Sequence, residues 1–473
     1  MGVTETLGRW AAETPETEAP LALSRAGDAI TDVVACMVAG AGDEGAERLR
    51  RTVAHYGSGP ATVFGSTDKA QAPYAALANG MAAHALDFDD NYAPGLTHAT
   101  AVLIPALLAL AEEIDASGRA LMDAYIVGLE IHGAIGRGIG RTHYDLGWHN
   151  TSTVGCVGTA AACGRLLGLD AERLTSAISL GVSMASGAKV QFGSMGKPFH
   201  AGMAAKNAVL AARMAADGFE ARPDAIEGER GFCDLYAGTP DREWKDILST
   251  LGQPLAIEEY GLAPKLYPCC GSAHKVLDGV LALRAAHGFT ADDVAKVETV
   301  VGYGNKRNLC YADPQQEMEA RFSMNYCVGV ALKSGRVSLS DFTPDAVQRP
   351  ELRAFLPKVS MEATEAGAEG DDPTHRLPHE VKIHLKDGRV FEESVQWARG
   401  TIHNPFDEAD TDAKFQDCCE GFLSPDDFDA AHQCLRELRA LKSVHELTRH
   451  LAFVAGGDNG ERFAKRYGAA AAQ

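Results

Sequence analysis

Alanine-rich segments with helical periodicity dominate the first half of the chain, and they constrain its fold more than any other feature. Between Leu21 and about Asp217, apolar residues recur at helical spacing, and Gly or Pro residues separate the segments. Alanine favours helix, and small side chains let helices approach closely. The pattern therefore predicts a large all-α core with helices over residues 23–37, 74–86, 101–114, 122–139, 153–167, 171–185 and 201–217.

The pattern changes near Gly261, where strand-like segments begin. Residues 294–301 and 379–385 alternate apolar and polar side chains, as half-buried strands do, and an Asp-Gly turn leads from the second of these into a strand over 390–395. The other elements expected in this part are a strand at 358–363 and helices near 272–286 and 323–332. After residue 405 helices return, over 412–420, 425–440 and 443–453.

The order of these segments predicts a mainly α fold with an inserted α+β domain. The chain has 473 residues, which is too many for a single hydrophobic core. We expect a large helical domain made from both chain ends, residues 1–262 and 401–473, and a smaller α+β lid domain, residues 263–400. The alanine-rich tail after Gly468 is expected to fray.

Charge and cysteine usage exclude several kinds of partner and cofactor. The chain has 44 Lys and Arg against 64 Asp and Glu, a net charge of -20, and no basic run, so we expect no nucleic-acid partner. The longest apolar run, residues 99–111, is too short to span a membrane and contains Pro105. Because no secretory signal stands at the N-terminus, we expect a cytoplasmic protein without membrane association. The 11 cysteines form no C-x-x-C pair, which predicts reduced thiols and no metal centre.

Three carboxylates lie close together near the end of one predicted helix. Asp87, Asp89 and Asp90 follow an apolar segment, and His98 lies a short loop further on. Carboxylates at a helix C-terminus oppose the helix dipole, so other groups must hold them there. They either pair with cations and stabilise loops, or at least one faces a cleft and orients a histidine, and the sequence leaves both possibilities open.

Two further segments place cationic or titratable groups at predicted helix N-termini. His149 precedes a helix that Thr151 or Ser152 can cap, so it is either an ordinary loop histidine or part of an anion site. Lys197 lies next to Pro198 at the start of another helix, where a cation is unfavourable unless an anion is shared with it.

The predicted domain junction holds another group of polar residues. Lys265 begins a segment that runs to His274, and binding sites are frequent at such junctions. Tyr326, in a helix of the α+β unit, is either a proton donor or a tyrosine of the core.

Taken together, these motifs resemble those of the MmgE/PrpD family, which includes 2-methylcitrate dehydratase, cis-aconitate decarboxylase and iminodisuccinate epimerase. The likeness extends from about Leu21 to Phe453, and its most specific parts are residues 79–90, 147–153, 197–202 and 265–274. The resemblance implies a helical domain built from both chain ends, an inserted α+β lid domain, a homodimer, and neither a metal nor an organic cofactor.

The resemblance also implies a set of site residues. Catalytic residues are expected at Asp87, His98, His149 and Tyr326, and substrate-binding residues at Asn91, Lys197, Lys265, Cys270 and His274. On this pattern Asp87 orients or tunes the catalytic histidine.

Three features depart from what a decarboxylase of the family is expected to carry. Asn91 stands where Thr is usual, Cys270 stands where His is usual, and His98 follows Asp87 by eleven residues, one more than expected. These departures disfavour decarboxylation and leave dehydration and epimerisation open.

The chemistry shared by these reactions is proton transfer at a carbon next to a carboxylate. Such a reaction needs a positioned base, for which a histidine is suited, and fixed cations that stabilise the developing negative charge. We therefore expect a lyase that dehydrates a citrate-like hydroxy polycarboxylate, with a small di- or tricarboxylate as substrate. An epimerase of iminodisuccinate or a similar dicarboxylate is the alternative, a cis-aconitate decarboxylase is a further one, and a non-enzymatic carboxylate-binding protein is the remaining possibility.

Overall fold

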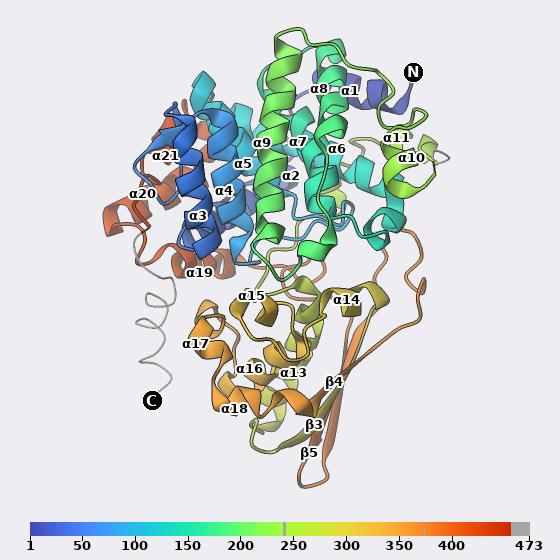
Figure 1. The fold of residues 1–473 in the computed structure, drawn as a ribbon, viewed down its shortest axis with the longest axis vertical. Helices are drawn as coiled ribbons and strands as arrows, with labels where there is room; N and C mark the ends of the chain where they lie inside the picture. The colour runs from blue at the N-terminus through green and yellow to red at the C-terminus, as the bar shows by residue number, and fades with distance from the viewer. Residues whose placement is uncertain (240–242, 373, 456–473) are drawn as a thin grey trace.

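The computed structural model describes residues 1–239, 243–372 and 374–455, and it has two parts (Figure 1). The upper part is a stack of helices from the N-terminal half, joined by helices from the C-terminal end of the chain. The lower part contains a sheet with helices beside it. Each part has its own hydrophobic core. The predicted fold class, mainly α with an inserted α+β unit, is confirmed.

Long helices form most of the first part, and short ones follow them. The long helices are α1 (Val3–Glu13), α2 (Pro20–Gly40), α3 (Glu44–Val53), α4 (Ala72–Ala85), α5 (Thr100–Ile114), α6 (Gly118–Asp145), α7 (Asn150–Leu166), α8 (Ala171–Met184) and α9 (Gly196–Ala216). The shorter elements are the strands β1 (Ala61–Thr62) and β2 (Lys69–Ala70) and the helices α10 (Phe232–Ala237), α11 (Lys245–Ser249) and α12 (Ala256–Glu259). Helix α5, which contains Pro105, is buried along nearly its whole length, as expected of a core helix.

Helices α4 and α9 pack very closely, and glycines make this possible. A Cβ atom at Gly80 of α4 would lie 2.7 Å from the Cα of Gly202, and a Cβ at Gly202 of α9 would lie 2.1 Å from the carbonyl oxygen of Leu77. Backbone atoms cannot move aside as flexible side chains can, so any larger residue must push the two helices apart.

Replacing Gly202 with alanine is therefore expected to destabilise the protein by about 1–3 kcal/mol, because the added methyl group overpacks the contact. Chemical denaturation measures the effect. Gly27, in the middle of α2, is a matched control, since no atom lies within 4 Å of the position that a Cβ would take there. Gly27→Ala should be neutral or should stabilise the protein by up to about 1 kcal/mol. Equal stabilities of the two variants would contradict the packing argument.

His132 of α6 is buried in the helical core without a polar partner. Neither ring nitrogen has a hydrogen-bond partner among the described residues, and burial lowers the pKa of His132 to about 3. An unfolded histidine titrates near pH 6.5. Between these values the unfolded chain binds a proton that the folded protein excludes, so stability falls as the pH drops below about 6.5.

His132→Leu should remove this part of the acid sensitivity. On going from pH 7.5 to pH 5, the variant is expected to lose about 2 kcal/mol less stability than the wild type. Urea denaturation at the two pH values measures the difference. The same substitution at the exposed His55 is the control and should leave the pH dependence unchanged. If both variants lose as much as the wild type, His132 is protonated in the folded protein.

The second part is built around a four-stranded sheet with the order β4-β3-β5-β6. β3 pairs in parallel with β4 and antiparallel with β5, and β5 pairs antiparallel with β6. Helices α13 and α16 lie against one face of this sheet. The elements are α13 (His274–His287), β3 (Val294–Val301), α14 (Tyr303–Asn308), α15 (Glu317–Ala320), α16 (Met324–Ser334), α17 (Pro344–Val347), α18 (Pro350–Arg353), β4 (Val359–Ala363), β5 (His379–Leu385) and β6 (Val390–Val395).

The chain then returns to the helical part through α19 (Glu408–Cys419), α20 (Pro425–Arg436) and α21 (His445–Thr448). The predicted helix over 443–453 is wrong beyond Thr448. There the chain leaves the helical path, since the Phe453 ring packs edge-on against Phe64 and the Ala455 amide donates to the carbonyl oxygen of Gly65. The tail after Gly468, predicted to fray, lies outside the described residues.

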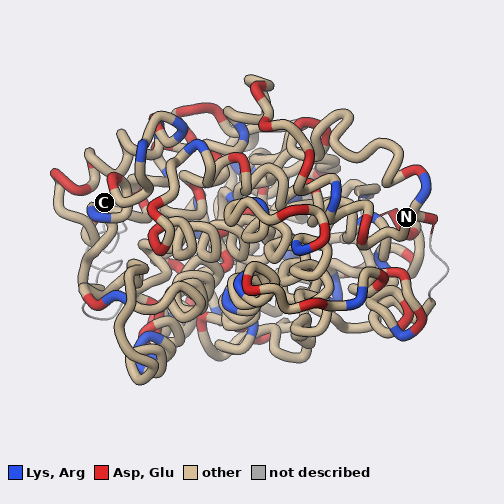
Figure 2. The backbone as a smooth tube through the Cα atoms, turned by 90° about the horizontal axis from the view of Figure 1, so that it is seen from above, with Lys and Arg blue, Asp and Glu red and all other residues tan. Residues whose placement is uncertain are grey.

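Two observations bear on possible partners. Within the described residues, no helix combines the length and the apolar character needed to cross a membrane. Figure 2 shows Lys and Arg positions scattered among Asp and Glu positions along the backbone, without a large basic cluster in that view.

Candidate active site

The acidic loop after α4 is the centre of the site. Asp87, Asp89 and Asp90 are all buried, with at most 1% of each residue exposed. Asp87 also has a φ of 52°, in the left-handed region that residues other than glycine rarely adopt. Buried carboxylates require compensation, which lysines supply at Asp87 and hydrogen bonds from histidines supply at Asp89. Asp90 accepts a hydrogen bond from the Thr100 hydroxyl, and burial raises its pKa to about 7.

Cationic side chains from distant parts of the chain bind the carbonyl oxygens of this loop. Arg321 Nε donates to the Leu86 oxygen at 3.1 Å, and Lys265 Nζ donates to the Asp87 oxygen at 2.7 Å. Lys414 of α19 donates to the Phe88 oxygen at 2.7 Å. Cations are favourable at the C-terminal end of a helix, where the carbonyl groups point outward. The loop is thus held in place by residues of both parts of the molecule.

Asp87 pairs with two lysines and not with a histidine. Its Oδ1 atom lies 2.5 Å from Lys197 Nζ and 3.2 Å from Lys265 Nζ. Burial opposes the charge of Asp87, but the two ammonium groups outweigh it and hold the pKa of Asp87 below its ordinary value. The anion that Lys197 was expected to share at the start of α9 is therefore, in this structure, the carboxylate of Asp87.

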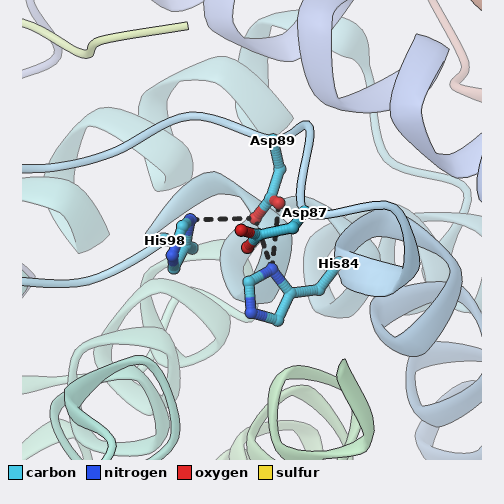
Figure 3. Close-up of side chains that lie close together, drawn as sticks. All are labelled: His84, Asp87, Asp89 and His98. Atoms are coloured by element: carbon cyan, nitrogen blue, oxygen red, sulfur yellow. Dashed lines mark hydrogen bonds and ion pairs between the residues drawn. The ribbon is translucent and has the colours of Figure 1, made fainter. Parts of the chain in front are cut away.

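The carboxylate that contacts the histidines is Asp89. His84 Nδ1 lies 2.9 Å from both oxygens of Asp89, and His98 Nδ1 lies 3.4 Å from Asp89 Oδ2 (Figure 3). Burial opposes the charge of Asp89, yet the two histidines lower its pKa. The expectation that Asp87 orients the histidine must be corrected, because the lysines take up Asp87 and leave this role to Asp89.

The hydrogen bonds of His98 determine which of its nitrogens can act as a base. Nδ1 lies 2.8 Å from the carbonyl oxygen of Asp90, which can only accept, so Nδ1 carries a proton. In the neutral ring Nε2 is then the basic atom, and the side chain, 14% exposed, lines the cavity. Burial and the charge of Lys265 lower the pKa of His98, which keeps the ring neutral. The Thr151 hydroxyl fixes the backbone here by accepting the His98 amide at 3.0 Å.

His84 links the two ion-paired groups. Its Nδ1 faces Asp89, and its Nε2 lies 2.9 Å from Lys197 Nζ, so both ring nitrogens are engaged. Burial lowers the pKa of His84 to about 3. No expectation from the sequence included this residue, although it stands one helical turn before Asp87, at the end of α4.

His149 lies at the N-terminus of α7, where neither Thr151 nor Ser152 supplies the predicted side-chain cap. Its Nδ1 is 3.1 Å from Nδ1 of His200, and its ring lies 5.9 Å from that of His84. Burial, followed by the charge of Lys197, lowers the pKa of His149. His149 is thus neutral, as His98 and His84 are.

A cavity of about 550 Å³ lies between the two parts of the molecule and joins these groups. The structure brings all but one of the predicted site residues to it, namely Asp87, Asn91, His98, His149, Lys197, Lys265, Cys270 and His274. Asn91 is fixed by reciprocal backbone hydrogen bonds with Ala263, both 2.9 Å long. Burial raises the pKa of Cys270, so its thiol is neutral.

Tyr326 does not reach the cavity. It is fully buried in the core of the second part, and its hydroxyl donates to the carbonyl oxygen of Asp341 at 2.5 Å. The expected proton donor is therefore a core tyrosine, which was the other interpretation of this residue.

The acidic loop also raises the question of a metal. Ligand atoms of His84, Asp87, Asp89 and His98 lie within 4.8 Å of one another, an arrangement that no spacing rule could detect in the sequence. However, Asp87 contacts two ammonium groups, and both nitrogens of His84 are engaged by Lys197 and Asp89. A divalent cation would have to compete with these lysines, so the residues fit a proton-transfer site better than a metal centre.

Comparisons with known proteins identify the family of the chain. Residues 5–245 match the MmgE/PrpD N-terminal domain, and residues 267–438 match the MmgE/PrpD C-terminal domain. The cis-aconitate decarboxylase of Homo sapiens is 29% identical over 404 residues, which cover 82% of this chain and 81% of the relative. That of Aspergillus terreus is 26% identical over 418 residues, covering 84% of this chain and 85% of the relative. The chain is therefore an enzyme of the lyase class that belongs to the MmgE/PrpD family.

Proposed function

We propose that this lyase removes a proton from the carbon next to a carboxylate of a small di- or tricarboxylate and expels hydroxide from the neighbouring carbon. The substrate class is that of citrate and its 2-methyl derivative. The observation that carries the proposal is the neutral His98, whose tautomer leaves Nε2 basic, in a cavity that Lys197 and Lys265 also line.

The proton transfer would proceed at His98. Nε2 takes the proton from carbon, and the C–H electron pair forms the double bond as the neighbouring C–O bond breaks. Asp89, 3.4 Å from Nδ1, stabilises the resulting imidazolium. Charge that develops on the substrate carboxylate is stabilised by Lys197 and Lys265, which are already desolvated and fixed by Asp87.

The leaving hydroxyl group needs a proton, and His149 is the candidate donor. Burial, and after it the charge of Lys197, lowers the pKa of His149 in the free enzyme. A bound substrate carboxylate offsets the charge of Lys197 and so raises the pKa of His149 in the complex, which is what a proton donor requires. Transfer of this proton completes a molecule of water and leaves the alkene product.

Decarboxylation of cis-aconitate is the second candidate. The cis-aconitate decarboxylases of Homo sapiens and Aspergillus terreus, which match 82% and 84% of this chain, favour it. In that reaction the C–C bond to a carboxylate breaks, carbon dioxide leaves, and a histidinium protonates the carbon. Asn91 and Cys270, the two positions that depart from the decarboxylase pattern, both line the cavity, which supports a difference in substrate or reaction.

Proton NMR in deuterated buffer distinguishes the reactions in one experiment. The purified protein is incubated with citrate, 2-methylcitrate, cis-aconitate and an iminodisuccinate-type dicarboxylate, and His98→Gln serves as the inactive control. Dehydration gives a new olefinic signal, decarboxylation gives a product that lacks one carboxyl group with release of carbon dioxide, and epimerisation gives C–H exchange without loss of mass. Binding of these acids without any of the three changes would overturn the proposal.

The proposal includes a homodimer, as the family resemblance implies. Size-exclusion chromatography with light scattering should give twice the mass of one chain, and a monomeric mass would contradict it.

A further inference from the structure

The cavity extends beyond the groups used in the proposed reaction. Its lining also includes Lys275, Thr364, Arg376 and His379, none of which takes part in that reaction, and we call these four residues the distal subsite. The segment from Lys265 to Lys275 forms a common wall, since Cys270 and His274 between them also line the cavity. A volume of about 550 Å³ lies within the range of about 300–1,000 Å³ that encloses drug-sized ligands. A small acid held at Lys197 therefore leaves space in the cavity.

The strand ends of the second part bring the distal subsite together. β3 ends at Val301, β4 ends at Ala363 immediately before Thr364, and β5 begins at His379. These strands are neighbours in the sheet, so Thr364 and His379 lie at the same sheet edge. Lys275 is at the start of α13, which packs against β5. Lys275 and His379 thus belong to regular elements, Thr364 directly follows one, and Arg376 lies in the segment before β5.

The charge of the distal subsite is positive and largely desolvated. Burial lowers the pKa of Lys275 to about 8 and that of Arg376 to about 10, and a neighbouring arginine adds to each shift. The charge of Glu369 opposes both shifts, and that of Asp372 opposes the shift of Arg376, but burial outweighs them. Lys275 Nζ donates to the carbonyl oxygen of Leu377 at 2.7 Å. Glu369 also lines the cavity, but its carboxylate is paired with Arg141 at 3.1 Å, and Glu365 is exposed to solvent. Two cations in a desolvated site favour an anion between them.

His379 gives an independent indication of a ligand. Only 3% of the residue is exposed, and its Nε2 accepts the Gly302 amide at 3.4 Å, so Nδ1 carries the proton of the neutral ring. This Nδ1–H group has no hydrogen-bond partner among the described residues, and neither has the Thr364 hydroxyl. Buried donors without acceptors are rare in proteins because they are costly. An acceptor in the cavity would satisfy both.

We propose that the distal subsite binds a second carboxylate of the substrate, remote from the reacting carbon. This rests on the proposed function in that the substrate is taken to be a polycarboxylate. Lys197 and Lys265 then bind the reacting end, while Lys275, Arg376 and His379 select for a second anionic group at a defined distance. The enzyme would in this way discriminate between acids by the separation of their carboxylates, and not only by the reacting group.

Calorimetric titration with unreactive linear dicarboxylates from succinate to pimelate tests the subsite directly. In the wild type, affinity should rise at least tenfold once the chain is long enough to reach from Lys197 to the distal subsite, and monocarboxylates of the same lengths should show no such gain. Lys275→Met should abolish the gain, because loss of a charge-assisted contact lowers the affinity for the longer acids by about tenfold to a hundredfold. The affinity of this variant for succinate should stay within about twofold of that of the wild type. His379→Leu should reduce the gain as well.

Lys386→Met is the control, because Lys386 is exposed in the turn after β5, away from the cavity, and carries the same charge. It should keep the wild-type pattern. No gain with length in the wild type, or a gain that persists in both Lys275→Met and His379→Leu, would overturn the subsite. These binding measurements do not depend on turnover. If the protein shows the length dependence but turns over no polycarboxylate, the proposed function is refuted and the subsite is not.

Discussion

Replacing His98 with glutamine is expected to lower kcat by about 10²–10⁴ and to change KM little, because the residue acts on the reacting proton. Nε2 is the basic nitrogen in this structure, since Nδ1 donates to the Asp90 carbonyl oxygen at 2.8 Å. Glutamine keeps a side chain of similar length and polarity but cannot take a proton. Steady-state kinetics and deuterium exchange at the substrate carbon measure the effect.

Two further variants make this test specific. The same substitution at the exposed His55 should leave kcat unchanged. Asp89→Asn should lower kcat and shift the acid limb of the pH profile to lower pH, because the imidazolium of His98 loses its counter-charge and its pKa falls. If His98→Gln retains exchange close to that of the wild type, the base is another residue, and His149→Gln becomes the decisive variant.

Replacing Lys197 with methionine is expected to destabilise the protein by about 3–5 kcal/mol, because it breaks a buried ion pair from one side. Only 3% of the Lys197 side chain and 2% of the Asp87 side chain are exposed, so solvent cannot replace the lost partner. Denaturant unfolding measures the change. Lys296→Met, which removes an exposed pair with Glu298, is the control and should cost about 0–1 kcal/mol.

A double variant separates the folding role of Lys197 from its role in binding. Asp87→Asn combined with Lys197→Met removes one charge of each sign, but it also takes the Asp87 carboxylate from the buried Lys265, so it should regain only part of the lost stability. Its KM should still be raised, by an amount equivalent to about 2–4 kcal/mol, if Lys197 contacts a substrate carboxylate. A double variant with wild-type KM would show that Lys197 serves the fold and not the substrate.

The regular elements could be predicted from local patterns. The strands β3, β5 and β6 have the predicted bounds, because alternation of apolar and polar residues and an Asp-Gly turn fix them within a few residues of sequence. The helical segment at 443–453 could not be predicted correctly, since contacts of Phe453 and Ala455 with residues near 64 end the helix. Such contacts override local helix propensity.

The site was predictable in its location but not in its internal contacts. Eight predicted residues line one cavity, and the cation-rich surroundings of the acidic loop follow from the unfavourable position of carboxylates at the end of α4. The family resemblance implied that Asp87 orients or tunes the histidine, whereas in the structure Asp89, two residues on, makes the contact with the histidines. His84 was missed because a histidine in an apolar helix is usually a core residue.

Local patterns were enough to predict most of the regular elements, and the order of these elements predicted the fold class. The set of site residues was implied by the family resemblance of the motifs. Only the tertiary structure shows which carboxylate pairs with the lysines and which contacts the histidines. It also shows that Tyr326 is a core residue and that Lys275 and His379 line the same cavity as Lys197. Ion pairs and hydrogen bonds depend on distances of a few ångströms between segments far apart in the chain, and no local pattern encodes those distances.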